Sequence, residues 1–146
     1  MNLKLSILEY IEEIKNGSFT IEEFVNETIQ RIDTVDGKLH AYLSVNEKAI
    51  DDAKKLDQKI TSNEKIGSCY GLPISIKDNM CVNGTKTTCA SKMLEHFVAP
   101  YTATVVDRLQ KEDSIIIGKT NLDEFAMGLS TEYSAYGESK NPWNTD

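Results

Sequence analysis

The stretch Gly71–Met80 reads GLPISIKDNM and has the pattern of a short strand that ends in a lysine. Ile74 and Ile76 alternate with Ser75 and Lys77, so the two pairs are expected on opposite faces of that strand. Together with the helical patterns before it and the second apolar strand after it, this strand predicts an α/β fold.

Lys77 has two interpretations on this pattern. A lysine flanked by isoleucines is expected to be partly desolvated, which lowers its pKa because the charged form loses most on leaving water. A drop from about 10.4 to near 7 corresponds to roughly 4 kcal/mol and would give a neutral amine able to act as a general base. Alternatively, the lysine lies at the end of a strand with its ammonium in water. The stretch alone leaves both interpretations open.

The residues downstream predict a polar wrap, a helix and a second strand. Residues 81–92 (CVNGTKTTCASK) are rich in Thr, Ser and Gly, and such a segment usually covers another part of the molecule. A helix is expected over about residues 103–111, with Thr102 as its N-cap. Residues 114–118 (SIIIG) are nearly all apolar, which is typical of a strand buried on both faces of a mainly parallel sheet.

The segment after the second strand resembles a phosphate-binding loop only superficially. Gly118-Lys119-Thr120 would need a glycine five residues before Gly118, and Asp113 stands there instead. Asn121 is instead expected to cap a short helix, with Glu124 at the capping-box position and Gly128 at its end.

The residues upstream of the opening stretch are mostly helical in pattern. The expected elements are a helix over 3–15, a helix that begins at the capping box Thr20–Glu23 and ends in a turn at Asp36-Gly37, a short strand over 39–43, and a helix from the capping box Ser44–Glu47 to about Ile60. The chain therefore predicts one domain, with a helical lead-in over residues 1–60. Residues 61–146 follow as the start of a mixed, mainly buried β-sheet flanked by helices.

Composition narrows the classes of function. A net charge of −7 and a pI near 4.9 argue against a direct grip on nucleic acid. Cys69, Cys81 and Cys89 have neither zinc-site spacing nor the even count of a disulfide framework, and His40 and His96 lie far apart in the sequence. We therefore expect no metal site. Acidic residues interrupt the N-terminal apolar segment, and no apolar run approaches the roughly 18 residues of a membrane span, so a cytoplasmic chain is expected.

Four motifs in register resemble the amidase signature family. They are GLPISIKDNM, TTCASKMLEHFVAPYTATVV, IIIGKTNLDEFAMGLSTEYSAYG and the tripeptide Asn141-Pro142-Trp143. The resemblance is dense from about Ile66 to Trp143 and looser over the first 60 residues. It implies the amidase signature fold, of which this chain would hold the first part.

The resemblance also implies a Ser–cis-Ser–Lys triad whose lysine falls on Lys77. In the family this lysine deprotonates a bridging serine, which activates the nucleophilic serine. Gly128 and Ser130 fall in a loop that the family places beside the substrate, although a plain helix-ending turn explains them as well. Both triad serines are expected in a Gly/Ser-rich segment after Asn141-Pro142-Trp143, and no such segment occurs within these 146 residues. The chain is therefore expected to be an N-terminal fragment that is inactive alone.

The wording TTCASK and DEFAMG is closest to the branch of the family that serves as the glutaminase subunit of tRNA-dependent amidotransferases. For that branch the resemblance implies release of ammonia from glutamine, for the ATP-dependent conversion of Glu-tRNA(Gln) to Gln-tRNA(Gln). The implied partners are a B subunit, which binds the tRNA and uses ATP and Mg²⁺, and a small C subunit. No cofactor is expected on this chain itself.

Two other functions remain open from the sequence. The first is a stand-alone amidase that acts on a small carboxamide. The second is a non-catalytic module that keeps the first part of the fold as a binding or scaffold piece.

Overall fold

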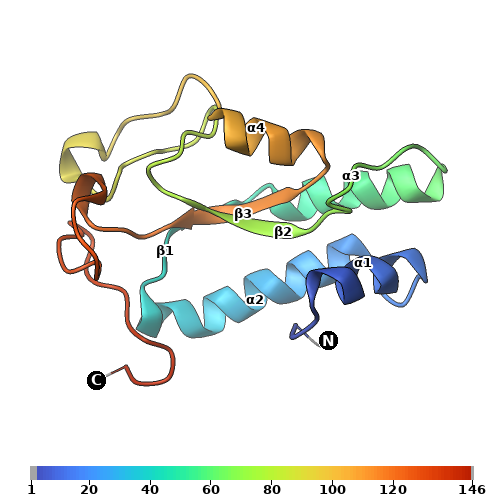
Figure 1. Cartoon of the computed structure of the whole chain (residues 1–146), viewed down its shortest axis with the longest axis horizontal. Coiled ribbons are helices and arrows are strands. Elements are labelled where there is room, and N and C mark those ends of the chain that lie inside the picture. The colour runs from blue at the N-terminus through green and yellow to red at the C-terminus, as the bar shows by residue number, and fades with distance from the viewer. Residues whose placement is uncertain (1–2, 146) are drawn as a thin grey trace.

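Helices cover both faces of a small mixed sheet in the computed structural model, which describes residues 3–145 (Figure 1). The elements in chain order are α1 (Ile7–Lys15), α2 (Ile21–Leu39), β1 (Tyr42–Val45), α3 (Ala49–Thr61), β2 (Pro73–Lys77), η1 (Lys92–Leu94), α4 (Thr104–Lys111), β3 (Ile115–Thr120) and η2 (Glu124–Ala126), where η marks a single 3₁₀ turn. None of the helices within residues 3–145 combines the length and the apolar character needed to cross a membrane.

The sheet confirms the predicted α/β class and its mixed character. Across the described residues the strand order is β1-β3-β2, with β2 parallel and β1 antiparallel to β3. The chain passes from β2 to β3 through the polar segment and α4, as a parallel pair requires. β3 is the interior strand, and β2 has β3 as its one neighbour within residues 3–145.

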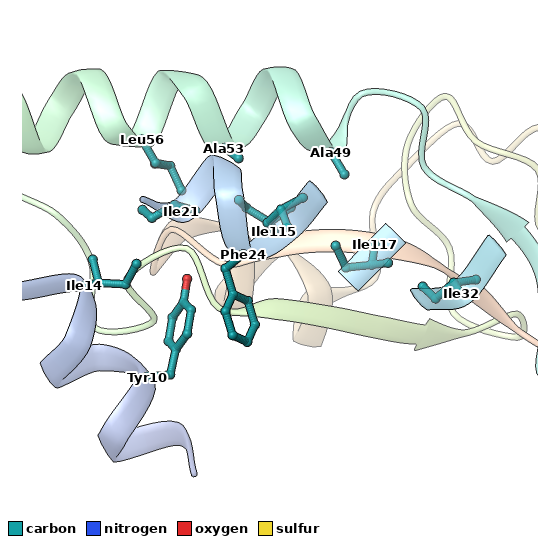
Figure 2. Close-up of a cluster of buried hydrophobic side chains, with 11 residues drawn as sticks. Tyr10, Ile14, Ile21, Phe24, Ile32, Ala49, Ala53, Leu56, Ile115 and Ile117 are labelled. Carbon is teal, nitrogen blue, oxygen red and sulfur yellow. The ribbon is translucent and has the colours of Figure 1, made fainter. Parts of the chain in front are cut away.

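Two apolar clusters explain why the first half of β3, residues 115–117, is apolar. On one face, Ile115 and Ile117 pack against side chains from α1, α2 and α3, among them Tyr10 and Phe24 (Figure 2). On the other face, Ile116 packs with β2 and with α4, which lies on the opposite side of the sheet from α2 (Figure 1). A strand with helices on both sides must present apolar side chains in both directions.

Side-chain capping boxes begin both α1 and α2. The Thr20 hydroxyl accepts a hydrogen bond from the Glu23 amide, and the Glu23 carboxylate accepts one from the Thr20 amide, so the predicted capping box is confirmed. α1 begins at Ile7 rather than at residue 3, because Ser6 and Glu9 form a second capping box there.

The predicted turn at Asp36-Gly37 is wrong, because α2 runs through it to Leu39. The chain reverses instead at His40, which adopts a left-handed conformation with φ of 51°. The Asp36 carboxylate accepts hydrogen bonds from the amides of Ala41 and Tyr42, so this residue stabilises the reversal from within the helix.

Two predicted N-caps are also wrong. Ser44 lies in β1, where pairing with β3 outweighs the local capping signal, and α3 begins only at Ala49. The Thr102 hydroxyl accepts a hydrogen bond from the Asn83 amide, so it fastens the polar segment rather than α4, which begins at Thr104.

Candidate active site

The candidate site lies at the carboxyl ends of the parallel strands β2 and β3, where the polar segment and the chain after β3 gather (Figure 1). Lys77 is the last residue of β2, opposite Thr120 in the register with β3. Catalytic groups often lie at this edge of a parallel sheet, because the strands end there and the loops that follow can converge.

Lys77 is exposed, which contradicts the expectation of a partly desolvated lysine. It shares its face of β2 with Ser75, which is also exposed, and within residues 3–145 no apolar layer covers this end of that face. The buried lysine of this region is Lys119 on the neighbouring strand, on the opposite side of the sheet.

Asp123 organises the loop that faces Lys77. One carboxylate oxygen of Asp123 accepts hydrogen bonds from the amides of Ser130 and Thr131, at 3.1 and 3.0 Å. The other accepts one from the Tyr133 amide at 3.1 Å. The bond from Tyr133, the bonds from Thr131 and Ser130 and the positive charge of Lys77 together hold the pKa of the Asp123 carboxyl below its usual value.

Two of the three residues that the sequence singled out therefore lie against one carboxylate, and the third, Lys77, is near enough for its charge to act on that group. Ser130 donates its amide to Asp123, and the charge of Lys77 acts on the same group. The backbone of Gly128 passes so close that a Cβ atom there would lie 2.3 Å from Cγ of Asp123. Gly128 and Ser130 are both exposed.

Sequence reasoning missed Asp123 and assigned a different role to its neighbours. The predicted cap by Asn121 is wrong, because its side-chain amide donates to the carbonyls of His40 and Gly137. Glu124 accepts a hydrogen bond from the buried Ser91 hydroxyl at 2.5 Å instead of closing a capping box. Asp123 accepts hydrogen bonds from backbone amides 7 to 10 residues later in the chain. Contacts of this kind follow no helix or strand periodicity, so a sequence pattern does not reveal them.

Strained backbone accompanies this arrangement. Cys89, Ala90, Phe125, Ala126 and Thr131 all have φ between 51° and 64°, a region that side chains other than glycine seldom adopt. Two hydrogen bonds join these segments, from the Phe125 amide to the Cys89 carbonyl and from the Ala135 amide to the Ala90 carbonyl, both at 2.9 Å. Such conformations persist where surrounding contacts over-determine them, and they cluster at functional sites.

The structure also separates this site from other candidates. A cavity of about 580 Å³ is lined by the end of β1 and the turn before α3, by the polar segment and by part of β3, and none of Lys77, Gly128 and Ser130 lines it. Within residues 3–145, no three side chains of His, Cys, Asp or Glu come together in a set that could hold a metal ion.

The close approach of Gly128 to Asp123 can be tested by substitution. Replacing Gly128 with alanine is expected to displace the 128–131 loop, because the added methyl would overlap the Asp123 carboxylate. If this loop binds the substrate of a full-length protein that carries these residues, KM for that substrate should rise about tenfold, and steady-state kinetics would measure it. Gly37→Ala is the control, because a Cβ atom at that exposed position meets no atom within 4 Å and its backbone lies outside the left-handed region. Equal KM values for both variants would contradict the substrate role of the loop.

Comparisons with known proteins give the family of the chain. The sequence profile of the family described as Amidase matches residues 23–146. The A subunit of the glutamyl-tRNA(Gln) amidotransferase of Cenarchaeum symbiosum is 56% identical over 141 residues, which is 97% of this chain and 29% of that protein. This chain thus spans about three-tenths of the length of that relative.

Solved structures agree over nearly the whole chain. The crystal structure of the A subunit of the Thermotoga maritima glutamyl-tRNA(Gln) amidotransferase superposes with a TM-score of 0.79 and 34% identity, over 99% of this chain and 29% of that chain. A native peptide amidase from Stenotrophomonas maltophilia superposes with a TM-score of 0.90 and 25% identity, over 98% of this chain and 31% of that chain.

Proposed function

This chain belongs to the amidase family, and on that premise we propose that Lys77 is the general base of an amide-hydrolysing site. The observation that carries the proposal is the position of Lys77 as the last, exposed residue of β2, near the loop that Asp123 holds through Ser130 and in which Gly128 packs against the same carboxylate. It puts an amine with access to solvent at the carboxyl end of a strand, beside a loop that can bind a substrate through its backbone.

In the proposed reaction Lys77 removes a proton from a bridging serine, which takes the proton of a nucleophilic serine. The nucleophile attacks the amide carbon, the carbon–nitrogen bond breaks, and the leaving nitrogen takes a proton and departs as ammonia. Water then hydrolyses the acyl-enzyme. Both serines belong to a Gly/Ser-rich segment that residues 1–146 do not contain, since Ser130, Ser134 and Ser139 lack such neighbours.

The substrate of the whole enzyme, in this proposal, is glutamine, and the protein is the glutaminase subunit of a tRNA-dependent amidotransferase in the cytoplasm. The identity of 56% to an amidotransferase subunit of that class supports this choice. A B subunit would bind Glu-tRNA(Gln), ATP and Mg²⁺, and a C subunit would complete the assembly. The acidic charge of this chain is consistent with leaving tRNA contact to the B subunit.

The experiment that tests this proposal is an assay of the full-length enzyme with its B and C subunits. We expect glutamine-dependent formation of Gln-tRNA(Gln) that requires ATP. Activity on small carboxamides with no gain on adding the B and C subunits would contradict the assignment.

A stand-alone amidase is the second candidate, because the peptide amidase superposes better than the Thermotoga protein, with TM-scores of 0.90 and 0.79. Identity points the other way, at 25% against 34%. We weigh identity more heavily, since a shared backbone serves many substrates whereas side chains select among them. Copurification with the B and C subunits distinguishes the two candidates.

The 146-residue chain alone is expected to hydrolyse no glutamine. A base without a serine to activate cannot form the acyl-enzyme, so ammonia release should match the protein-free blank. Turnover by the purified 146-residue chain that Lys77→Ala abolishes would overturn this expectation.

A further inference from the structure

A buried ion pair lies directly behind the candidate base. Asp78 and Lys119 are 2% and 3% exposed, and the Lys119 ammonium lies 2.7 Å from the Asp78 carboxylate. The same ammonium donates to the Thr87 hydroxyl at 3.2 Å and to the Lys86 carbonyl at 3.4 Å. A buried pair is tolerable only when such hydrogen bonds satisfy both charges.

Asp78 fastens the end of β2 in two directions. Its backbone amide donates to the Thr120 carbonyl, which continues the pairing with β3 beyond the last residue of β2. Its second carboxylate oxygen accepts hydrogen bonds from the amide and the hydroxyl of Thr88, at 2.8 and 2.6 Å. Its carbonyl accepts one from the Cys89 amide.

These contacts lead to the loop that faces the candidate base. Cys89 and Ala90 have positive φ, and their carbonyls accept hydrogen bonds from Phe125 and Ala135. Phe125 and Ala135 lie before and after Ser130 in the chain, on either side of the loop whose amides donate to Asp123. A series of hydrogen bonds thus connects Asp78, at the end of β2, through Cys89 and Ala90 to the segment that contains the proposed substrate loop.

Lys77 precedes Asp78 and points to the other face of the strand, so the backbone that holds one side chain also directs the other. We propose that Asp78 and Lys119 form a positioning pair that holds Lys77 in place for proton transfer and offsets the charge behind it. This inference rests on the proposed amidase function. It assigns no contact with substrate to either residue.

Other charged groups lie near the pair and near Lys77. Lys86 and Glu95 line a small cavity of about 120 Å³ together with Asp78, and the Asp78 charge raises the pKa of Cys89, which burial raises more strongly. α4 packs Val106 into the apolar cluster with Ile76 and Ile116, and its Asp107–Lys111 pair lies toward solvent. On the other face, Asp123 is the carboxylate whose pKa responds to Lys77.

The kinetic test uses Lys119→Met in the full-length enzyme with its partner subunits. We expect kcat for glutamine hydrolysis to fall about 10- to 100-fold, because a shifted base loses its alignment. KM should stay within about twofold, because Asp78 is still present and keeps its hydrogen bonds to Thr88 and Cys89, which lead to the substrate loop. Lys119→Arg should recover most of the rate, since Lys119 borders the 580 Å³ cavity and a guanidinium has room there. Lys86→Met is the matched control. It removes an exposed charge from the same segment, leaves the carbonyl that Lys119 uses, and should keep the wild-type rate.

A second experiment measures the pKa of the Lys77 amine and does not depend on enzyme activity. Competitive acetylation with acetic anhydride across pH, followed by mass spectrometry, gives the pKa of the Lys77 amine. Lys119→Met leaves a negative charge behind Lys77 and should raise that pKa by about one unit, whereas Asp78→Asn leaves a positive charge and should lower it by about as much. The double variant should return it close to the wild-type value.

The outcomes separate the two claims. Opposite shifts in the acetylation curves together with rescue by Lys119→Arg would support the positioning pair. The positioning pair would be overturned if all variants gave the same acetylation curve. It would also be overturned if Lys119→Arg and the double variant lost as much activity as Lys119→Met. If the wild-type enzyme hydrolyses no amide, the proposed function fails, and the acetylation curves still test the pair. Should Lys119→Met not fold, Asp78→Asn and the double variant keep the test complete.

Discussion

Replacing Lys77 with methionine is expected to lower kcat/KM for glutamine hydrolysis by the full-length enzyme at least about 10³-fold, because the nucleophile loses its base. Lys77→Arg should be as inactive, since a guanidinium stays protonated at every accessible pH and cannot accept a proton.

The fold should tolerate the loss of Lys77. The side chain is exposed at the end of β2, and surface substitutions of this kind usually change the free energy of unfolding by less than about 0.5 kcal/mol. The melting temperature and the circular dichroism spectrum would verify this, with Lys86→Met as an exposed-lysine control. Retention of a tenth or more of the wild-type turnover in Lys77→Met would rule out the assigned role.

The buried pair predicts a large difference between two lysines whose ion pairs are equally short. Lys119 to Asp78 and Lys111 to Asp107 are both 2.7 Å apart, but the first pair has side chains 4% and 3% exposed and the second 73% and 44%. Lys119→Met leaves an uncompensated carboxylate in the interior, and we expect it to lower the free energy of unfolding by about 3–5 kcal/mol. Lys111→Met removes an exposed pair and should change it by less than about 1 kcal/mol.

Urea unfolding of the full-length enzyme, followed by tryptophan fluorescence and circular dichroism, would measure the difference. The double variant Asp78→Asn with Lys119→Met should be more stable than Lys119→Met alone, because it removes the unpaired charge. Equal destabilisation by Lys119→Met and Lys111→Met would show that the interior pair contributes no more than a surface one.

The sequence predicted the elements whose signals are local. The alternation at Ile74 and Ile76 and the apolar run at 115–117 have a single structural solution, so both strands and the layer on each side of β3 follow from them. The polar segment at 81–92 was expected to wrap over another part, and it does so over Asp78 and Lys119.

The site was harder to predict, because its contacts are not periodic. The same spacing of residues that makes a capping box at Thr20 occurs at Ser44, where pairing of β1 with β3 decides the outcome. Burial of Lys119 rather than Lys77 depends on which face of the sheet the polar segment covers. Neighbouring residues of β2 and β3 give no local signal for that choice.

The strand order β1-β3-β2 has a consequence for synthesis on the ribosome. α2 and α3 come from a continuous stretch and can pair soon after they leave the exit tunnel, whereas β1 and β2 must wait for β3, which lies between them and emerges last. Until then the apolar sides of α2 and α3 lack Ile115 and Ile117. A nascent chain stalled before residue 115 should therefore expose an apolar surface that binds a chaperone such as trigger factor, and one stalled well after residue 120 should bind it less.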